Sequence, residues 1–197
     1  EFKFNKTVAI GTYAFANTSL NTVNLNAECQ SIAAYAFSGC SSLQKFSYKS
    51  DKLKLGTGVF SGCSKLNNLE INADVVPAYA FLNLSSLKNI TLGKDVAVIN
   101  ELAFAGCGSI EQVTVNSDNA NFTADESGKL ILTKDGSKLV LVVPGYGGTA
   151  GKLTLDETVK TIGRGAFSAT SAIKTVVAPG VTSVEEYAFY YCSNLEG

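Results

Sequence analysis

The stretch INELAFAGCGSIEQVTV, residues 99–115, shows a motif that recurs along the chain. Its fixed points are an Ala-Phe pair (Val-Phe in one copy), an aliphatic residue five positions before the Phe, and another five or six positions after it. The seven copies are centred on Phe15, Phe37, Phe60, Phe81, Phe104, Phe167 and Phe189. Most copies follow one another at intervals of 21 to 23 residues, and a period in this range predicts a solenoid of stacked coils.

A short run of alternating apolar and polar residues follows each Phe, as in Leu-Glu-Ile at 69–71 and Val-Thr-Val at 113–115. Such alternation places the apolar side chains on one side of a strand. We therefore predict one short parallel strand per coil of about 22–23 residues. A short helical or 3-10 turn at the Ala-Phe pair would form the opposite wall, and the Phe rings would stack in a column. The predicted inward-facing strand pairs are Val23/Leu25, Phe46/Tyr48, Leu69/Ile71, Ile90/Leu92, Val113/Val115 and Val176/Ala178.

The repeat is interrupted between Phe104 and Phe167, where 63 residues hold no Ala-Phe motif. Residues 129–133 and 138–143 are two strand candidates, and Asp135-Gly136 between them is a strong hairpin-turn signal. We predict a hairpin coil over residues 116–152 that bulges from the solenoid without forming a second domain. The whole chain, 1–197, is thus expected to be one solenoid, and because both ends fall within repeats we expect a fragment of a longer chain.

The motif resembles the unit of the BspA-like leucine-rich-repeat family, I-G-x-x-A-F-x-x-C-x-x-L-x-x-I-x-I. The resemblance is carried by IAAYAFSGCSSLQKFSY at 32–48, INELAFAGCGSIEQVTV at 99–115 and VEEYAFYYCSNL at 184–195, and it extends over nearly the whole chain. It implies a right-handed solenoid, in which a hairpin coil is a common variation. It also implies a secreted or cell-surface bacterial protein that adheres to proteins of a host or a neighbouring cell.

Composition excludes two classes of partner. The chain has 16 Lys and Arg against 17 Asp and Glu, and the basic residues are scattered, so no basic face is available for nucleic acid. No stretch approaches the ~20 apolar residues that span a bilayer, so we expect no membrane insertion within this segment. Any targeting or anchoring segment of an extracellular or surface protein would lie outside it.

Four of the five cysteines lie three positions after a motif Phe: Cys40, Cys63, Cys107 and Cys192. Other copies have Thr18, Leu84 or Thr170 at this position, which indicates a packing position for a small buried residue. We predict buried free thiols here and at Cys29. A Cys40–Cys63 disulfide is the alternative, because these residues would be neighbours in adjacent coils. The paired short spacings of a zinc site are missing.

Catalytic chemistry has little support. The chain contains no His, which is the commonest general base and the usual activator of a Ser or Cys nucleophile. We expect no enzyme, no cofactor and no metal. The segment GYGGTAG at 145–151 lacks the spacing of a phosphate-binding loop and is interpreted as a flexible connector. DNANFTAD at 118–125 weakly resembles a calcium loop but lacks its regular alternation and its Gly.

Four copies place a Tyr two positions before the Phe: Tyr13, Tyr35, Tyr79 and Tyr187. Rows of aromatic side chains can bind sugars, but Gly58, Leu102 and Gly165 interrupt this row. We therefore predict that the rings pack partly against their neighbours and keep their hydroxyls in solvent.

The outward residues of the strands are the candidate binding surface. The candidate ligand-binding residues are Asn24, Ser47, Glu70, Thr91, Thr114 and Val177, flanked by Thr22, Lys45, Asn68, Asn89, Gln112 and Thr175. Solenoids bind partners on such extended faces. This one is polar and nearly neutral, which favours an unidentified protein or glycan ligand bound with modest affinity. The function predicted is a non-catalytic interaction or adhesion module, and the alternative is a passive spacer that presents another domain at the cell surface.

Overall fold

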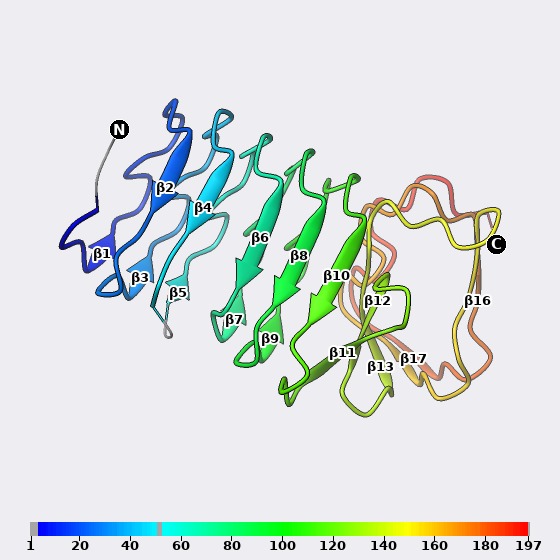
Figure 1. Ribbon diagram of the computed structural model, residues 1–197. Helices are drawn as coiled ribbons and strands as arrows, with labels where there is room; N and C mark the ends of the chain where they lie inside the picture. Colours follow the sequence, from blue (N-terminus) through cyan, green and yellow to red (C-terminus); the bar gives the residue numbers. More distant parts are fainter. Residues whose placement is uncertain (1–3, 51–52, 197) are drawn as a thin grey trace.

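Two rows of parallel strands run along the solenoid (Figure 1). The computed structural model describes residues 4–50 and 53–196, so the outermost residues of the two ends that we expect to fall within repeats lie outside the described residues. The long-strand row consists of β2 (Thr22–Asn24), β4 (Lys45–Ser47), β6 (Asn68–Ile71), β8 (Asn89–Leu92), β10 (Gln112–Val115), β14 (Lys152–Thr154) and β16 (Thr175–Val177). The short-strand row consists of β1 (Ala9–Ile10), β3 (Ser31–Ile32), β5 (Lys54–Leu55), β7 (Val75–Val76), β9 (Val98–Ile99), β15 (Thr161–Ile162) and β17 (Ser183–Val184).

The long-strand row confirms the predicted strands and their inward sides. Because the coils have nearly equal lengths, equivalent residues pair across strands: Leu69 lies opposite Ile90, and Ile90 lies opposite Val113. The inward side chains of β6 and β8 are buried, as are Val23 and Leu25. Among the other predicted inward side chains, Val113 is buried, and the rest, which include Phe46 and Val176, are half-buried.

The short-strand row was missed by the sequence analysis, which predicted a single strand per coil. The aliphatic residue five positions before each Phe is the second residue of a two-residue parallel strand. Ile10 pairs with Ile32, and Ile32 pairs with Leu55. This position therefore contributes a backbone ladder in every copy and a core side chain in all but the last, where Val184 is exposed, which explains the aliphatic residue there.

The turns around the seven motif Phe residues, here called the Ala-Phe wall, are not helical. The described residues contain no helix, so the predicted helical or 3-10 turn is not confirmed. In every copy the residues two before and two after the Phe have φ between 56° and 76°, as at Tyr13 and Asn17. Left-handed residues interrupt a right-handed helix. The wall is instead a series of tight turns, and the Phe N–H bonds across to the next coil, as from Phe15 to the Ala36 carbonyl at 2.8 Å.

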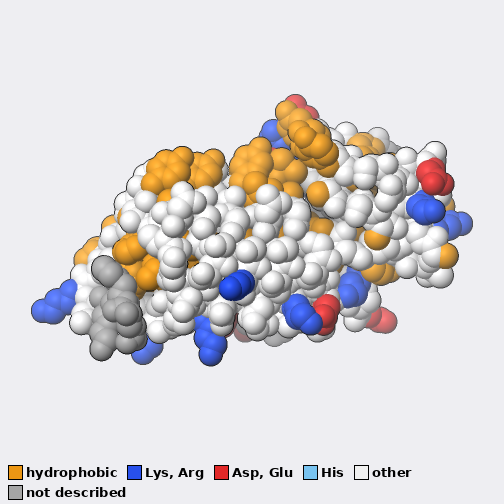
Figure 2. Space-filling model, turned by 90° about the horizontal axis from the view of Figure 1, so that it is seen from above, with side chains coloured by type: hydrophobic (Ala, Val, Ile, Leu, Met, Phe, Trp, Pro, Cys, Tyr) orange, Lys and Arg blue, Asp and Glu red, His pale blue; other side chains and the backbone are white. Residues whose placement is uncertain are grey.

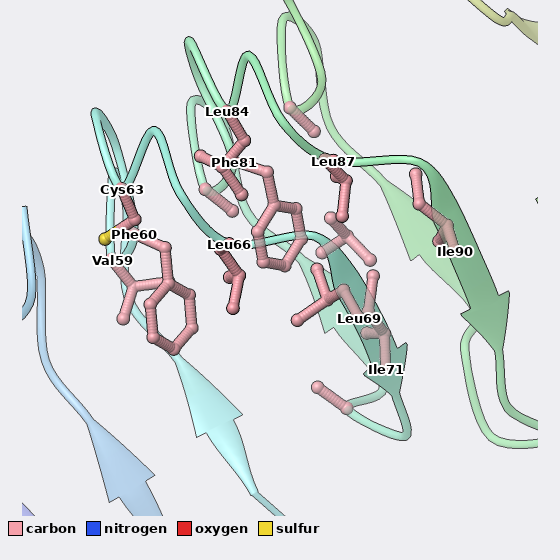
Figure 3. Packing of buried hydrophobic residues seen from close by; sticks show 14 of the residues in the cluster. Val59, Phe60, Cys63, Leu66, Leu69, Ile71, Phe81, Leu84, Leu87 and Ile90 are labelled. Carbon is pink, nitrogen blue, oxygen red and sulfur yellow. The ribbon is translucent and has the colours of Figure 1, made fainter. Parts of the chain in front are cut away.

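The motif Phe rings stack in the core, as predicted. Successive centroids from Phe15 to Phe104 lie 5.3 to 6.0 Å apart, with interplanar angles of at most 18°. Figure 3 shows Phe60 and Phe81 pointing into the interior together with Leu66 and Leu69. Phe167 and Phe189 form a separate pair at 4.6 Å. The column is therefore in two parts, and the hairpin coil lies between them.

The hairpin coil is built into the stack. It contains β11 (Phe122–Ala124), β12 (Leu130–Thr133) and β13 (Lys138–Val142), and β13 joins the short-strand row by pairing parallel with β15. Ile131 packs in the core of the N-terminal coils and Leu139 in the core of the C-terminal coils. The predicted bulge is thus limited to the turn, where Lys134 and Asp135 are exposed, because the strands themselves are needed to fill the core.

Candidate functional site

The long-strand row presents most of the predicted binding residues to solvent. Asn24, Ser47, Glu70, Thr91 and Thr114 are all exposed. The structure aligns the last three directly across β6, β8 and β10. In the neighbouring pair of strands, the Ser47 hydroxyl donates a hydrogen bond of 2.7 Å to the Asn24 amide oxygen.

Val177 does not lie with the other five residues. It is half-buried in β16, which pairs only with β14, and its partner in that sheet is Thr154. Figure 1 shows β2 to β10 side by side along one face, whereas β16 lies at the far end beyond the hairpin strands. The hairpin coil separates the two groups, and the sequence period could not reveal this separation.

The face formed by β2, β4, β6, β8 and β10 is polar, and its side chains hydrogen-bond to one another within and between coils. We call the outward residues of these five strands the strand face. The Asn89 side chain donates to the Asn68 side chain at 3.0 Å, and Asn72 donates to the Glu70 carboxylate at 3.2 Å. At the rim, Lys88 forms an exposed ion pair of 3.0 Å with Glu111. The strand face therefore offers hydrogen-bond donors and acceptors with little net charge.

The tyrosines of the Ala-Phe wall pack as predicted at one end. The rings of Tyr13 and Tyr35 stack at 5.2 Å with an interplanar angle of 7°. The Tyr35 ring in turn covers Gly58, where a Cβ atom would stand 2.2 Å from a ring carbon. The interruption of the row at Gly58 therefore makes room for the neighbouring ring.

At the other end of the wall, tyrosines surround a pocket that the sequence analysis missed. The pocket has a volume of about 230 Å³ and is lined by Tyr79, Glu101, Leu102, Arg164, Tyr187 and Tyr190. We call it the tyrosine pocket. Figure 2 shows hydrophobic side chains gathered in patches along one long edge of the molecule, with basic and acidic side chains beside one of them.

Comparison with known proteins defines the family. The sequence profile of the BspA type leucine rich repeat region matches residues 8–125 and 148–197, in six copies. The chain belongs to the BspA-type leucine-rich repeat family. No relative with a curated description matches it.

Solved structures show the same fold. A leucine-rich repeat protein from Eubacterium ventriosum has 25% identity and a TM-score of 0.79, over 93% of this chain and 48% of that protein. The pneumococcal vaccine antigen PcpA has 18% identity and a TM-score of 0.72, over 95% and 55%. A leucine-rich repeat protein from Bacteroides ovatus has 21% identity and a TM-score of 0.59, over 99% and 40%. This chain thus spans about half the length of these proteins.

The BspA-type cysteine position is structural in this chain. All five cysteines are free, and four of them are buried. The thiols of Cys40 and Cys107 donate hydrogen bonds of 2.9 Å to the carbonyls of Phe15 and Phe81, each one coil earlier. Burial raises the pKa of the Cys107 thiol to about 12, so it stays protonated at neutral pH. The predicted packing role is confirmed for the four buried cysteines, Cys192 is half-buried, and Cys40 and Cys63 do not form the alternative disulfide.

The segment that weakly resembles a calcium loop serves the fold. Asn119 is 1% exposed, and its amide nitrogen donates to the carbonyls of Gly93 and Val96 at 2.8 and 3.0 Å. Its amide oxygen accepts from the backbone N–H groups of Asn121 and Phe122, each at 2.8 Å. The side chain thereby ties the start of the hairpin coil to the coil before it. In residues 4–50 and 53–196, no three His, Cys, Asp or Glu residues are grouped as metal ligands.

The connector at 145–151 is hydrogen-bonded to the following coil, since the Gly151 carbonyl accepts from Lys174 and Thr175. Across the described part of the chain, no helix has the length and apolar character to cross a membrane.

Proposed function

We propose that this chain is a non-catalytic interaction module of a bacterial surface protein, and that it binds a protein or glycan partner through the strand face. The observation that carries the proposal is the register of Glu70, Thr91 and Thr114, which places three exposed polar side chains in one row. Their strands hydrogen-bond as neighbours, about 4.8 Å apart.

The inward and outward residues of these strands have different tasks. Leu69, Ile90 and Val113 hold the strands on the core, so the residues between them are free to serve recognition. Adjacent coils add further side chains to each row, which makes the face extended. The strand face of the described residues has no large aromatic side chain pointing outward, and Trp, Tyr and Arg dominate tight interfaces. A partner of modest affinity therefore suits it.

The non-catalytic part of the proposal rests on the chemistry of the chain. The sequence contains no His, and the buried cysteines are engaged with backbone carbonyls instead of with a general base. The proposed surface location rests on family membership, because the BspA-like resemblance implies a secreted or cell-surface bacterial protein.

The proposal can be tested by capture on a panel of immobilised extracellular-matrix glycoproteins. The test variant is Glu70→Arg with Thr91→Arg, which adds bulk and positive charge to the strand face. The control is Glu157→Arg with Thr158→Arg, which makes the same two replacements at exposed loop positions away from it. We expect the control to bind as the unmodified chain does and the test variant to lose capture, with equal melting temperatures for both.

Retention of capture by the test variant would move the site away from the strand face. Lack of capture by the unmodified chain across the panel would instead favour the second candidate, a passive spacer. That candidate is supported by the stacked core, in which the hairpin coil joins the two halves of the solenoid.

A further inference from the structure

The tyrosine pocket lies where the Ala-Phe wall is interrupted. The hairpin coil fills the core between the coils of Phe104 and Phe167 but contributes no Ala-Phe turn. These two coils consequently meet on the wall: a Cβ atom added at Gly165 would stand 3.5 Å from the Glu101 Cα. Leu102 and Gly165 are the two residues that replace Tyr in this part of the row, and the smaller side chains leave the hollow open.

Three aromatic rings border this hollow. Tyr79 belongs to the coil of Phe81, and Tyr187 and Tyr190 belong to the coil of Phe189. The Tyr187 and Tyr190 rings meet edge to face, with centroids 5.7 Å apart and an interplanar angle of 74°. All three remain substantially exposed, at 36%, 53% and 42%. Arg164 lies over one face of the Tyr187 ring, and the remaining exposed ring surface is available to a ligand.

Polar groups converge on the same hollow. The Arg164 guanidinium lies 5.5 Å from the centre of the Tyr187 ring, 3.2 Å from the Glu186 carboxylate and 3.8 Å from that of Glu101. The neighbouring phenols of Tyr191, Tyr79 and Tyr187 raise the pKa of Tyr190, so its hydroxyl is protonated at neutral pH. The pocket therefore offers donors and acceptors beside aromatic faces.

We propose that the tyrosine pocket binds one neutral pyranose ring of a glycan. A pyranose has an apolar C–H face that can lie on a Tyr ring and hydroxyls at its rim that can reach Arg164 and Glu101. The volume of about 230 Å³ is below the ~300–1,000 Å³ of pockets for drug-sized ligands, which suits a single sugar.

The charges around the pocket favour a neutral ligand over an ionic one. Arg164 already occupies a cation position beside the Tyr187 ring, so an incoming cation is repelled there. The carboxylates of Glu101 and Glu186 flank the guanidinium and disfavour an anion. The remaining class is a neutral ligand that hydrogen-bonds both to the guanidinium and to a carboxylate. The pocket and the strand face are formed by different residues on different walls, so this inference does not rest on the proposed function.

The test uses the methyl glycosides of glucose, galactose, mannose and N-acetylglucosamine, observed by saturation-transfer NMR on the intact chain. The test variant is Tyr187→Gly, and the matched control is Tyr13→Gly at the same repeat position. Glycine occupies this position naturally at Gly58 and Gly165 and accepts its positive φ. Tyr190→Ala provides a second test at a position whose φ is not positive.

We expect millimolar binding of at least one glycoside, weakened about tenfold or more in Tyr187→Gly and in Tyr190→Ala, and unchanged in Tyr13→Gly. Three results would overturn the inference. They are saturation transfer to none of the four sugars, sugar binding that survives both test variants, and binding of tetramethylammonium with none of the sugars, which would make the pocket a cation cage.

Discussion

The Cys63 thiol donates a hydrogen bond of 3.2 Å to the carbonyl oxygen of Phe37, one coil earlier. Cys40 and Cys107 make the same contact, so the residue three positions after a motif Phe ties its coil to the preceding one. Thr18 and Thr170 occupy the same position and donate to the Phe carbonyl of their own coil. In six of the seven copies the position therefore holds a small side chain that carries a donor, Cys or Thr, whereas Leu84 fills it with an apolar side chain alone.

The buried Cys107 thiol predicts a loss of stability in alkali. Burial raises the pKa of the Cys107 thiol from 9.0 to about 12 in the fold. Its stabilising contribution is complete below pH 9 and is lost as the pH rises toward 12, because the unfolded chain ionises first. We expect Cys107→Thr to remove this part of the pH dependence, a difference of roughly 1 kcal/mol by pH 10. The measurement is the urea midpoint of the unmodified chain and of Cys107→Thr at pH 7.5 and at pH 10. If the midpoint falls by the same amount in both proteins between the two pH values, Cys107 has no role in the pH dependence.

The Phe column predicts large and position-dependent losses of stability. Phe81 and Phe104 are at most 2% exposed and lie 5.3 Å apart. Replacing either by Ala should reduce the free energy of unfolding by about 3–5 kcal/mol. Phe189→Ala is the control. The Phe189 ring is half-buried at the end of the stack, so its removal should reduce the free energy of unfolding by less. An unchanged melting temperature for Phe104→Ala would contradict the column.

The Asn119 side chain should contribute strongly to the stability of the link between the hairpin coil and the coil before it. Its amide makes four hydrogen bonds in a buried position, so Asn119→Ala leaves carbonyl and N–H groups without partners. We expect a loss of roughly 3 kcal/mol in thermal unfolding. Asn116→Ala is the matched control, because Asn116 is exposed and its side chain accepts one bond, from Asp118. Equal effects of the two changes would show that the buried network is not needed.

The features of this fold differ in how much sequence signal they leave. The inward residues of β6 and β8 could be predicted because alternation over four residues is a clear pattern. The short-strand row could not, since two residues are too few to show a period. The left-handed turns did leave a signal, because Gly39, Gly62 and Gly106 all lie two positions after a Phe. Asn17 and Asn83 occupy the same position in two other copies.

The strand face and the tyrosine pocket also differ in how far the sequence predicts them. The row Glu70, Thr91 and Thr114 follows directly from equal coil lengths. Val177 lies apart from this row, and the period does not show that the hairpin coil separates β16 from β10. The tyrosine pocket depends on the same coil, which brings Tyr79 near Tyr187 and Tyr190 although no local pattern joins them. Long-range packing, not local propensity, decides these features.

The most direct measurement of the central claim uses thiol labelling, since the native cysteines are mostly buried. A single exposed thiol is introduced by Thr91→Cys on the strand face, by Lys134→Cys in the hairpin turn or by Thr158→Cys in a loop. The labelling rate of each variant is compared with and without a matrix glycoprotein that captures the chain. We predict that the partner slows labelling at position 91 and leaves positions 134 and 158 unchanged. Slowed labelling at position 134 with no change at 91 would contradict the account and place the partner on the hairpin.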